Sequence, residues 1–142
     1  MPASPIQSPA GYVPSRALAY ADVDSTSLLV SVGNPLPVTM GSAAAATPLA
    51  GSTSVTAVLG PFQPVVGRAV MLSLAGTWTG TVKVRRSTDA GTTKLALTVA
   101  GATWGQFTAN CCEPVWEESE SAAQLYLDVT LASGTLAYRL AQ

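Results

Sequence analysis

The chain of 142 residues is long enough for one domain of ordinary size, and only 11% of its residues are charged, against about 25% in a typical soluble protein. Its seven basic and eight acidic residues nearly balance, which argues against a surface that wraps nucleic acid. The chain has no histidine, which excludes Ser-His-Asp and Cys-His catalysis and the usual zinc sites within one chain.

The N-terminal region is predicted to be extended. Nine of the ten prolines precede residue 65, and each proline removes a backbone donor and biases the residue before it away from helix. Two short apolar runs, Ser27–Val32 and Pro35–Met40, flank the turn signal Gly33-Asn34 and are predicted as strands without a partner in the chain. We expect an arm over residues 1–52 that adds strands to the sheet edge of another chain. The side chains expected to make this contact are Leu28, Leu29, Val30, Leu36 and Val38.

The segment Ser42–Ser54 is rich in small residues and is predicted as a linker. Its four consecutive alanines are too few to nucleate a helix, because isolated helices need about 12 to 15 residues.

From about residue 53, apolar and polar residues alternate with a period of two, as in strands with one buried face. Six to eight short strands without a helical stripe predict an all-β fold, in which an antiparallel β-sandwich or jelly-roll-like domain over residues 53–142 follows the long extended arm. Turn signals separate the runs at Gly76, Asp89 with Gly91, Ala100-Gly101, Pro114 and Ser133-Gly134. The side chains expected inside are Val70, Leu72, Leu74, Val82, Val84, Leu95, Leu97, Val99, Leu125, Leu127, Val129, Leu131, Leu136, Tyr138 and Leu140. Those expected outside include Met71, Ser73, Lys83, Arg85, Tyr126, Asp128 and Arg139.

The spacing Ser87-x-Asp89-x-Gly91-x-Thr93 raises the question of whether Asp89 marks a catalytic or metal site or only a turn. The stretch joins two alternating runs, so we place Asp89 and Gly91 at a hairpin tip, where aspartate binds backbone amides and glycine accepts a positive φ. The spacing also resembles the Asp box, a hairpin-turn motif of sialidase-type propellers and other β proteins, although Lys94 stands where that motif usually has an aromatic residue. In its usual setting the Asp box is structural, so we predict a structural turn.

Four glutamates lie within eight residues around Trp116: Glu113, Glu117, Glu118 and Glu120. Paired carboxylates serve acid and base catalysis on glycosides, and they also bind Ca²⁺. No aspartate-rich loop with fixed ligand spacing accompanies them, so we expect an exposed acidic loop. Within it, Trp116, Glu117 and Glu118 are a candidate recognition loop.

The only cysteines, Cys111 and Cys112, are adjacent, and we expect two free thiols, since no CxxC spacing supports a redox or metal site. We assign no catalytic residue, no metal ligand and no cofactor. A small glycosidase that uses two of the glutamates is the enzyme alternative.

Three stretches together resemble small β-sandwich virion structural proteins of tailed bacteriophages. They are VSVGNPLPVTM, LGPFQPVVGRAVMLSLAGTWTGTVKVRRSTDAGTTK and LYLDVTLASGTLAYRLAQ, and the resemblance covers roughly residues 28–142. In such proteins a strand of the type SLSGTWTGTVxVxRSxDGGxT precedes a closing SGTLxYRLxQ, and Ala90 stands here in place of the first glycine of DGG. The pattern consists of sheet and turn residues, so it carries over no active residue.

The resemblance implies a structural virion component, either a capsid decoration or cement protein or a fibre-like accessory protein. The low charge and the arm favour cement, with the major capsid protein and further copies of this chain as partners, in a trimer by analogy with decoration proteins. The alternative is a head or tail fibre module that recognises host surface glycans. No apolar run reaches the roughly 18 residues needed to cross a bilayer, so we expect no membrane partner. The nearly balanced charge leads us to expect no nucleic-acid partner. We expect the virion to assemble in the host cytoplasm.

Overall fold

The computed structural model describes residues 19–21, 27–38, 41 and 43–142, and it divides the chain into two units, residues 1–42 and residues 43–142. Within these described ranges every regular element is a β-strand, and none is a helix that could cross a membrane. The predicted all-β fold class is confirmed.

The first unit contains a small antiparallel sheet of two strands. β1 (Ala19–Ala21) pairs with β2 (Ser27–Leu29), and Tyr20 lies opposite Leu28. The prediction that the run beginning at residue 27 lacks a partner in the chain is therefore wrong, because β1 supplies one.

The predicted turn at Gly33-Asn34 is present as a bend over residues 31–34. The backbone N–H of Ser31 donates to the carbonyl oxygen of Asn34 (2.9 Å), and the N–H of Asn34 donates to that of Ser31 (3.1 Å). Residues 35–38 form no strand, so the predicted strand is wrong there, and residues 39 and 40 lie outside the described residues. Two prolines in this stretch remove the donors that a paired strand would need.

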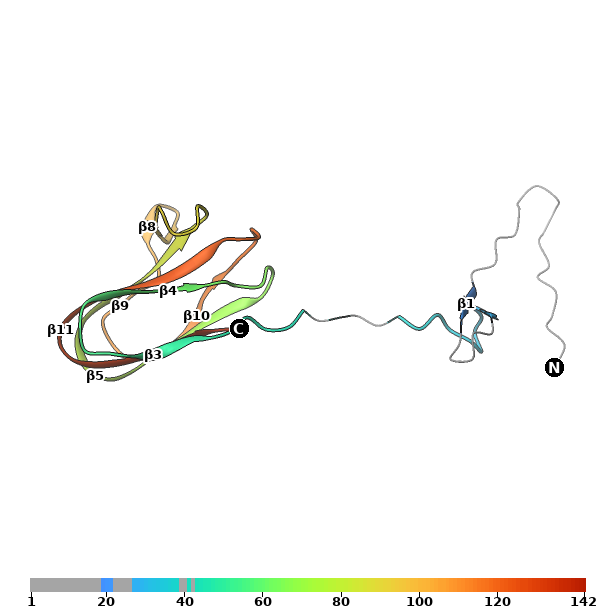
Figure 1. The fold of residues 1–142 in the computed structure, drawn as a ribbon, viewed down its shortest axis with the longest axis horizontal. Coiled ribbons are helices and arrows are strands. Elements are labelled where there is room, and N and C mark those ends of the chain that lie inside the picture. Colours follow the sequence, from blue (N-terminus) through green and yellow to red (C-terminus); the bar gives the residue numbers. More distant parts are fainter. Residues whose placement is uncertain (1–18, 22–26, 39–40, 42) are drawn as a thin grey trace. The chain divides into compact units, whose positions relative to one another are not determined.

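The second unit is built around two long strands that pair with each other along nearly their whole length. β5 (Ala69–Ser87) has 19 residues and β11 (Gln124–Ala141) has 18, and their register runs from Ser87 opposite Gln124 to Met71 opposite Ala141. In Figure 1 both strands curve together at one side of the unit. The other strands are β3 (Leu49–Thr53), β4 (Ala57–Phe62), β6 (Leu95–Ala96), β7 (Thr98–Val99), β8 (Ala102–Thr103), β9 (Gln106–Phe107) and β10 (Cys111–Glu117).

Glycines allow this long pair of strands to bend. Gly76 and Gly80 on β5 have φ values of 111° and 146°, and Gly134 on β11 has a φ of 88° beside a register shift between Leu131 and Ser133. A Cβ atom at Gly134 would lie 2.1 Å from the carbonyl oxygen of Thr77, so no larger residue fits there. The turns predicted at Gly76 and at Ser133-Gly134 are wrong, because both strands continue through these positions.

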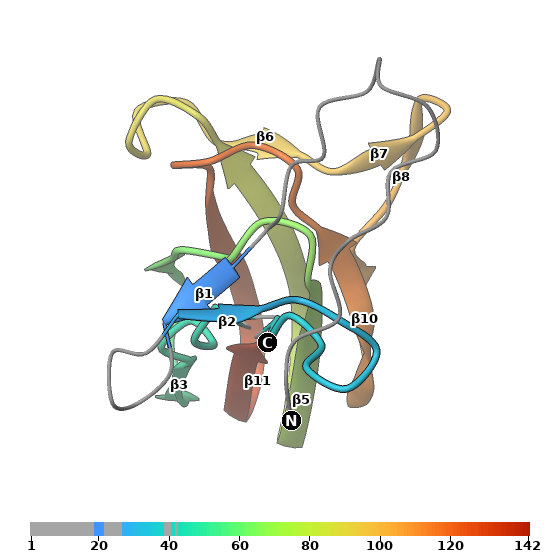
Figure 2. The ribbon, with the colours of Figure 1, turned by 90° about the vertical axis from the view of Figure 1, so that its right-hand side faces the viewer.

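The bend turns one continuous sheet into two packed layers. In the first, β10 and β3 flank the halves of β5 and β11 near residues 69–75 and 135–141. In the second, β6 and β9 flank β5 on one side and β4 flanks β11 on the other, near residues 81–87 and 124–131. Figure 2 shows β6, β7 and β8 at one end of this antiparallel β-sandwich.

The linker predicted at residues 42–54 is wrong over residues 49–53. Those residues form β3, because the edge of β11 offers them backbone partners, with Tyr138 opposite Gly51. The second unit accordingly begins at Ala43, whose carbonyl oxygen accepts a hydrogen bond of 3.0 Å from Nη1 of Arg68.

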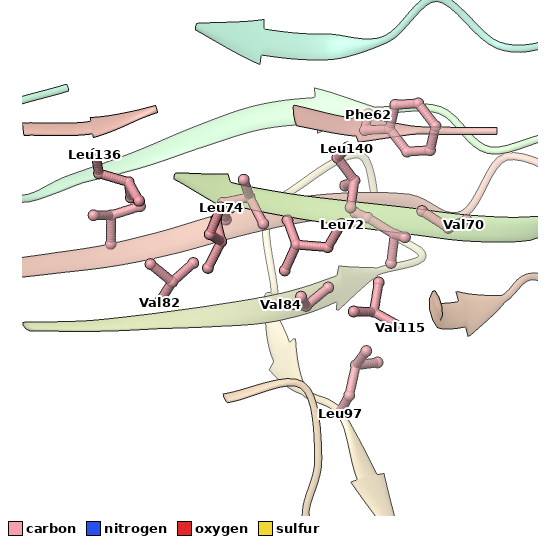
Figure 3. Packing of buried hydrophobic residues seen from close by; sticks show 13 residues of the cluster. Phe62, Val70, Leu72, Leu74, Val82, Val84, Leu97, Val115, Leu136 and Leu140 are labelled. Carbon is pink, nitrogen blue, oxygen red and sulfur yellow. The ribbon is translucent and has the colours of Figure 1, made fainter. Parts of the chain in front are cut away.

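The core lies between the two halves of β5 and β11. Figure 3 shows Leu72 and Leu74 on one half of β5 directed toward Val82 and Val84 on the other. All four side chains are buried, as the alternation predicts, and Phe62 of β4 is also buried. The cluster is completed by Val70, Leu97, Val115, Leu125, Leu127, Val129, Leu136 and Leu140.

The alternation is wrong on the two short strands β6 and β7. Leu95 and Val99, both expected inside, are 66% and 55% exposed. They lie on two-residue strands, and within the described part of the chain β7 pairs only with β8, through the turn that Ala100-Gly101 predicts. Pro114 is also wrong as a turn, because it lies inside β10 next to a register shift, where an edge strand tolerates proline.

Candidate functional site

The turn after β5 is built around the hydroxyl of Ser87, which is buried. This hydroxyl accepts a hydrogen bond from the backbone N–H of Gly91 (2.9 Å) and donates one to Oδ1 of Asp89 (2.7 Å). The backbone N–H of Thr93 donates to both Asp89 oxygens, at 2.8 and 3.0 Å. Ala90 and Gly91 have positive φ values of 55° and 84°. The motif thus holds a hairpin tip together.

These bonds also fix the charge of Asp89. The backbone N–H of Thr93, followed by the Ser87 hydroxyl, lowers the pKa of Asp89 to about 2. A carboxylate with such a pKa stays ionised near neutral pH, so Asp89 is a poor general acid or base there.

Tyr126 is expected on the outer face, but it is buried. The hairpin folds over it, since Nζ of Lys94 lies 4.7 Å from the centre of its ring and also donates to the carbonyl oxygen of Gly91. Its own hydroxyl donates to Oε1 of Gln124 at 2.8 Å. Lys94 therefore contacts an aromatic ring from its unusual position in the motif.

Glu118 is the only buried acidic side chain among the described residues, with 1% of its surface exposed. Nε and Nη2 of Arg86 donate to its two oxygens, both at 2.8 Å. The backbone N–H groups of Ser119 and Glu120 donate to Oε1 at 3.0 and 2.9 Å, and Nε1 of Trp116 donates to Oε2 at 3.1 Å. The Arg86 guanidinium is the main cause that lowers the pKa of Glu118 to about 2.

Arg86 has a second carboxylate partner, because its Nη2 also donates to Oε2 of Glu120 at 2.7 Å. The hydrogen bonds to Glu118 and then to Glu120 raise the pKa of Arg86. Arg86 and the two glutamates together carry a net negative charge.

The candidate recognition loop is thus only partly exposed. Glu117 is exposed, Trp116 is half-buried against the core, and Glu118 is buried, so the expectation of an exposed loop is wrong for Glu118. The sequence pattern indicates Glu118 but not its partner Arg86, which lies on β5, 32 residues away.

A cleft of about 460 Å³ lies between the Asp89 turn and Trp116. Its lining includes residues of both the turn and the candidate recognition loop, which the sequence analysis names separately. Its lining consists of Arg86, Ser87, Thr88, Asp89, Thr93, Leu95, Ala96, Leu97, Thr98 and Trp116. Sequence reasoning misses Arg86, Leu95 and Thr98 as parts of one site, because they lie on β5, β6 and β7 and come near Trp116 only in the folded chain.

The arm residues lie in the first unit. Leu28 and Leu29 belong to β2 and Val30 follows it, whereas Leu36 and Val38 belong to no strand. Leu29, Leu36 and Val38 are 47%, 41% and 74% exposed, while Leu28 and Val30 are partly buried.

Cys111 and Cys112 carry free thiols on β10, the first half-buried and the second exposed. Burial is the main cause that raises the pKa of the Cys111 thiol. Oγ of Ser73 lies 3.4 Å from Sγ of Cys112. Across the described ranges, no three Cys, Asp or Glu side chains gather in a way that could hold a metal ion.

Comparisons with known proteins yield no match to this chain, whether among family models, curated proteins or solved structures.

Proposed function

We propose that the chain is a structural virion protein of a tailed bacteriophage, a decoration or cement subunit that binds the assembled shell and further copies of itself through its first unit. The three stretches that resemble phage virion proteins motivate this proposal. The major capsid protein and a trimer of this chain are part of it.

The observation that carries the proposal is the exposure of apolar side chains in the first unit. Leu29, Leu36 and Val38 are 41% to 74% exposed. The only sheet described there has three residue pairs, and an isolated two-stranded sheet is marginal in water. Burial of this apolar surface against a partner would supply the stabilisation that so small a sheet lacks.

The second unit offers an edge that fits strand addition. Among the residues that the structure describes, β3 pairs with β11 on one side only, and its sequence LAGST contains neither charge nor proline. Charges and prolines are the usual devices that stop an edge strand from pairing with another chain. The β3 edge is therefore compatible with the strand addition that the arm requires.

A full-length double variant, Leu36→Glu and Val38→Glu, tests the proposal. We expect it to lose co-sedimentation with capsids and to sediment as a smaller species than the wild type, because each glutamate would be buried without a partner. The matched control, Val55→Glu with Val66→Glu, adds the same charges at valines of the second unit that are 64% and 46% exposed. Equal capsid occupancy of both double variants and the wild type would contradict the proposal.

A truncation of residues 1–42 provides the second test. The cut must precede Ala43 and β3, which belong to the second unit. The remaining chain should give the circular dichroism of a folded β protein while failing to bind shells. Cryo-electron microscopy of particles then separates the two virion locations, since copies spread over the shell indicate decoration and copies at one vertex indicate a tail or fibre.

A further inference from the structure

The cleft between the Asp89 turn and Trp116 combines two kinds of wall. Trp116, Leu95 and Leu97 give it an apolar side, and Thr88 and Thr98 give it hydroxyl groups that bind no other part of the described chain. A volume of about 460 Å³ lies within the usual range for small-molecule sites, about 300 to 1,000 Å³. The cleft therefore suits a small ligand with one apolar face and several hydroxyl groups.

The charges at the cleft disfavour an anionic ligand. Arg86 is its only basic lining residue, and it already binds the carboxylates of Glu118 and Glu120. Asp89 adds a further negative charge, and both of its oxygens already accept hydrogen bonds inside the turn. A sulfate, phosphate or sialic acid carboxylate would meet like charges here, each of which weakens binding. A neutral ligand does not meet this penalty.

The aromatic wall is held in place before any ligand arrives. Nε1 of Trp116 donates to Glu118, and Glu118 is fixed by Arg86 and by two backbone N–H groups. Because the indole N–H is engaged, the ring contributes only its apolar surface to a ligand. A rigid aromatic residue loses little conformational entropy on binding, which favours affinity.

We propose that this cleft binds a neutral saccharide, with an apolar face of a sugar ring against Trp116 and Leu95 and the sugar hydroxyls hydrogen-bonded to Thr88 and Thr98. This activity is independent of shell binding through the first unit, and either can be present without the other. It assigns the Asp89 turn a second role, as one wall of a binding site, besides closing a hairpin.

The test uses the full chain on an array of neutral, sialylated, sulfated and amine-bearing oligosaccharides, followed by titration of the best neutral glycan by nuclear magnetic resonance. The main variant is Leu95→Arg, which places a long charged side chain at the cleft. Its control is Val99→Arg, an equal change at a valine that is 55% exposed and lies outside the cleft lining. We expect at least about a tenfold loss of affinity in Leu95→Arg and none in Val99→Arg.

A second pair of variants checks the polar wall. Thr98 lines the cleft, while Thr103 lies opposite it in the β7–β8 pair and outside the lining. Loss of one hydrogen bond in Thr98→Val should weaken binding about threefold to tenfold, whereas Thr103→Val should not. Backbone resonances that match the wild type show that each variant is folded.

The proposal is overturned if no neutral glycan binds, if only sialylated, sulfated or amine-bearing glycans bind, or if Leu95→Arg binds as tightly as Val99→Arg. Neutral glycan binding that Leu95→Arg alone removes supports it. Failure of shell binding in the same variants leaves this result unchanged.

Discussion

Two neighbouring arginines of β5 form ion pairs in two different settings, one with a carboxylate on the outer face of the sandwich and one with a buried carboxylate. Arg85 binds Asp128 and Arg86 binds Glu118, each with a shortest separation of 2.8 Å. The arginine side chains are almost equally exposed, at 26% and 24%. Their partners differ, because Asp128 is 30% exposed and Glu118 only 1%.

The difference teaches that the accessibility of the partner, rather than the distance, decides what each pair contributes. Asp128 can exchange its arginine for water at little cost, so an exposed pair contributes about 1 kcal/mol or less. Glu118 has no such substitute, because its remaining partners are two backbone N–H groups and one indole. Arg86 is thus required to keep a charge inside the protein.

The largest expected effect follows from the replacement Arg86→Met, which leaves Glu118 buried without a cationic partner. We expect a loss of about 3 to 5 kcal/mol in the free energy of unfolding, measured by urea denaturation at pH 7. The double variant Arg86→Met with Glu118→Leu should recover much of this loss. A single variant as stable as the wild type would show that water replaces the arginine.

Acid should produce the next largest effect. The pKa of Glu118 is lowered from 4.5 to about 2 in the folded chain, so its contribution is complete above pH 4.5 and is lost as the pH falls toward 2. Linkage gives a loss on the order of 3 kcal/mol over that window. Denaturation midpoints of the wild type and Glu118→Gln should converge as the pH falls. Parallel curves would contradict the assignment, because Asp89 titrates in the same window in both proteins.

Ser87→Ala extends the comparison to a buried neutral group on the next residue of β5. The hydroxyl supports the Gly91 amide and the Asp89 carboxylate, so its removal should cost about 1 to 3 kcal/mol. Amide exchange should become faster at Gly91 and Thr93. Unchanged exchange at both amides would mean that the turn holds without the serine.

The smallest effect should come from Arg85→Met on the outer face. We expect a change of less than about 1 kcal/mol, which added salt reduces further. Equal losses in Arg85→Met and Arg86→Met would refute the distinction between the two pairs.

Local pattern predicts much of the fold. The alternation places Val82 and Val84 inside correctly, because both layers are antiparallel and each buries one face. It does not reveal that β5 runs through Gly76, since glycine marks both a turn and a bend and only the opposite strand distinguishes them. The exposure of Leu95 also escapes the pattern, because β6 has only two residues and both are exposed although it pairs with β5.

The candidate site was predictable only in parts. The spacing from Ser87 to Thr93 suffices for the turn, because its hydrogen bonds are local in sequence. The burial of Glu118 depends on a partner from a distant strand, and that glutamate also accepts a hydrogen bond from the indole of Trp116 at the wall of the cleft. Long-range charge pairing leaves no periodic signal in the sequence.

The shared ribbon of β5 and β11 has a consequence for how the second unit comes apart. β5 and β11 run through both layers. If the layer on one side of the bend unfolds, the other layer therefore keeps two central strands whose continuations are unpaired. We expect a single cooperative transition, with protected amides of both layers exchanging at one common free energy of opening. A partner that binds and stabilises one layer would thereby raise the free energy of unfolding of the whole second unit.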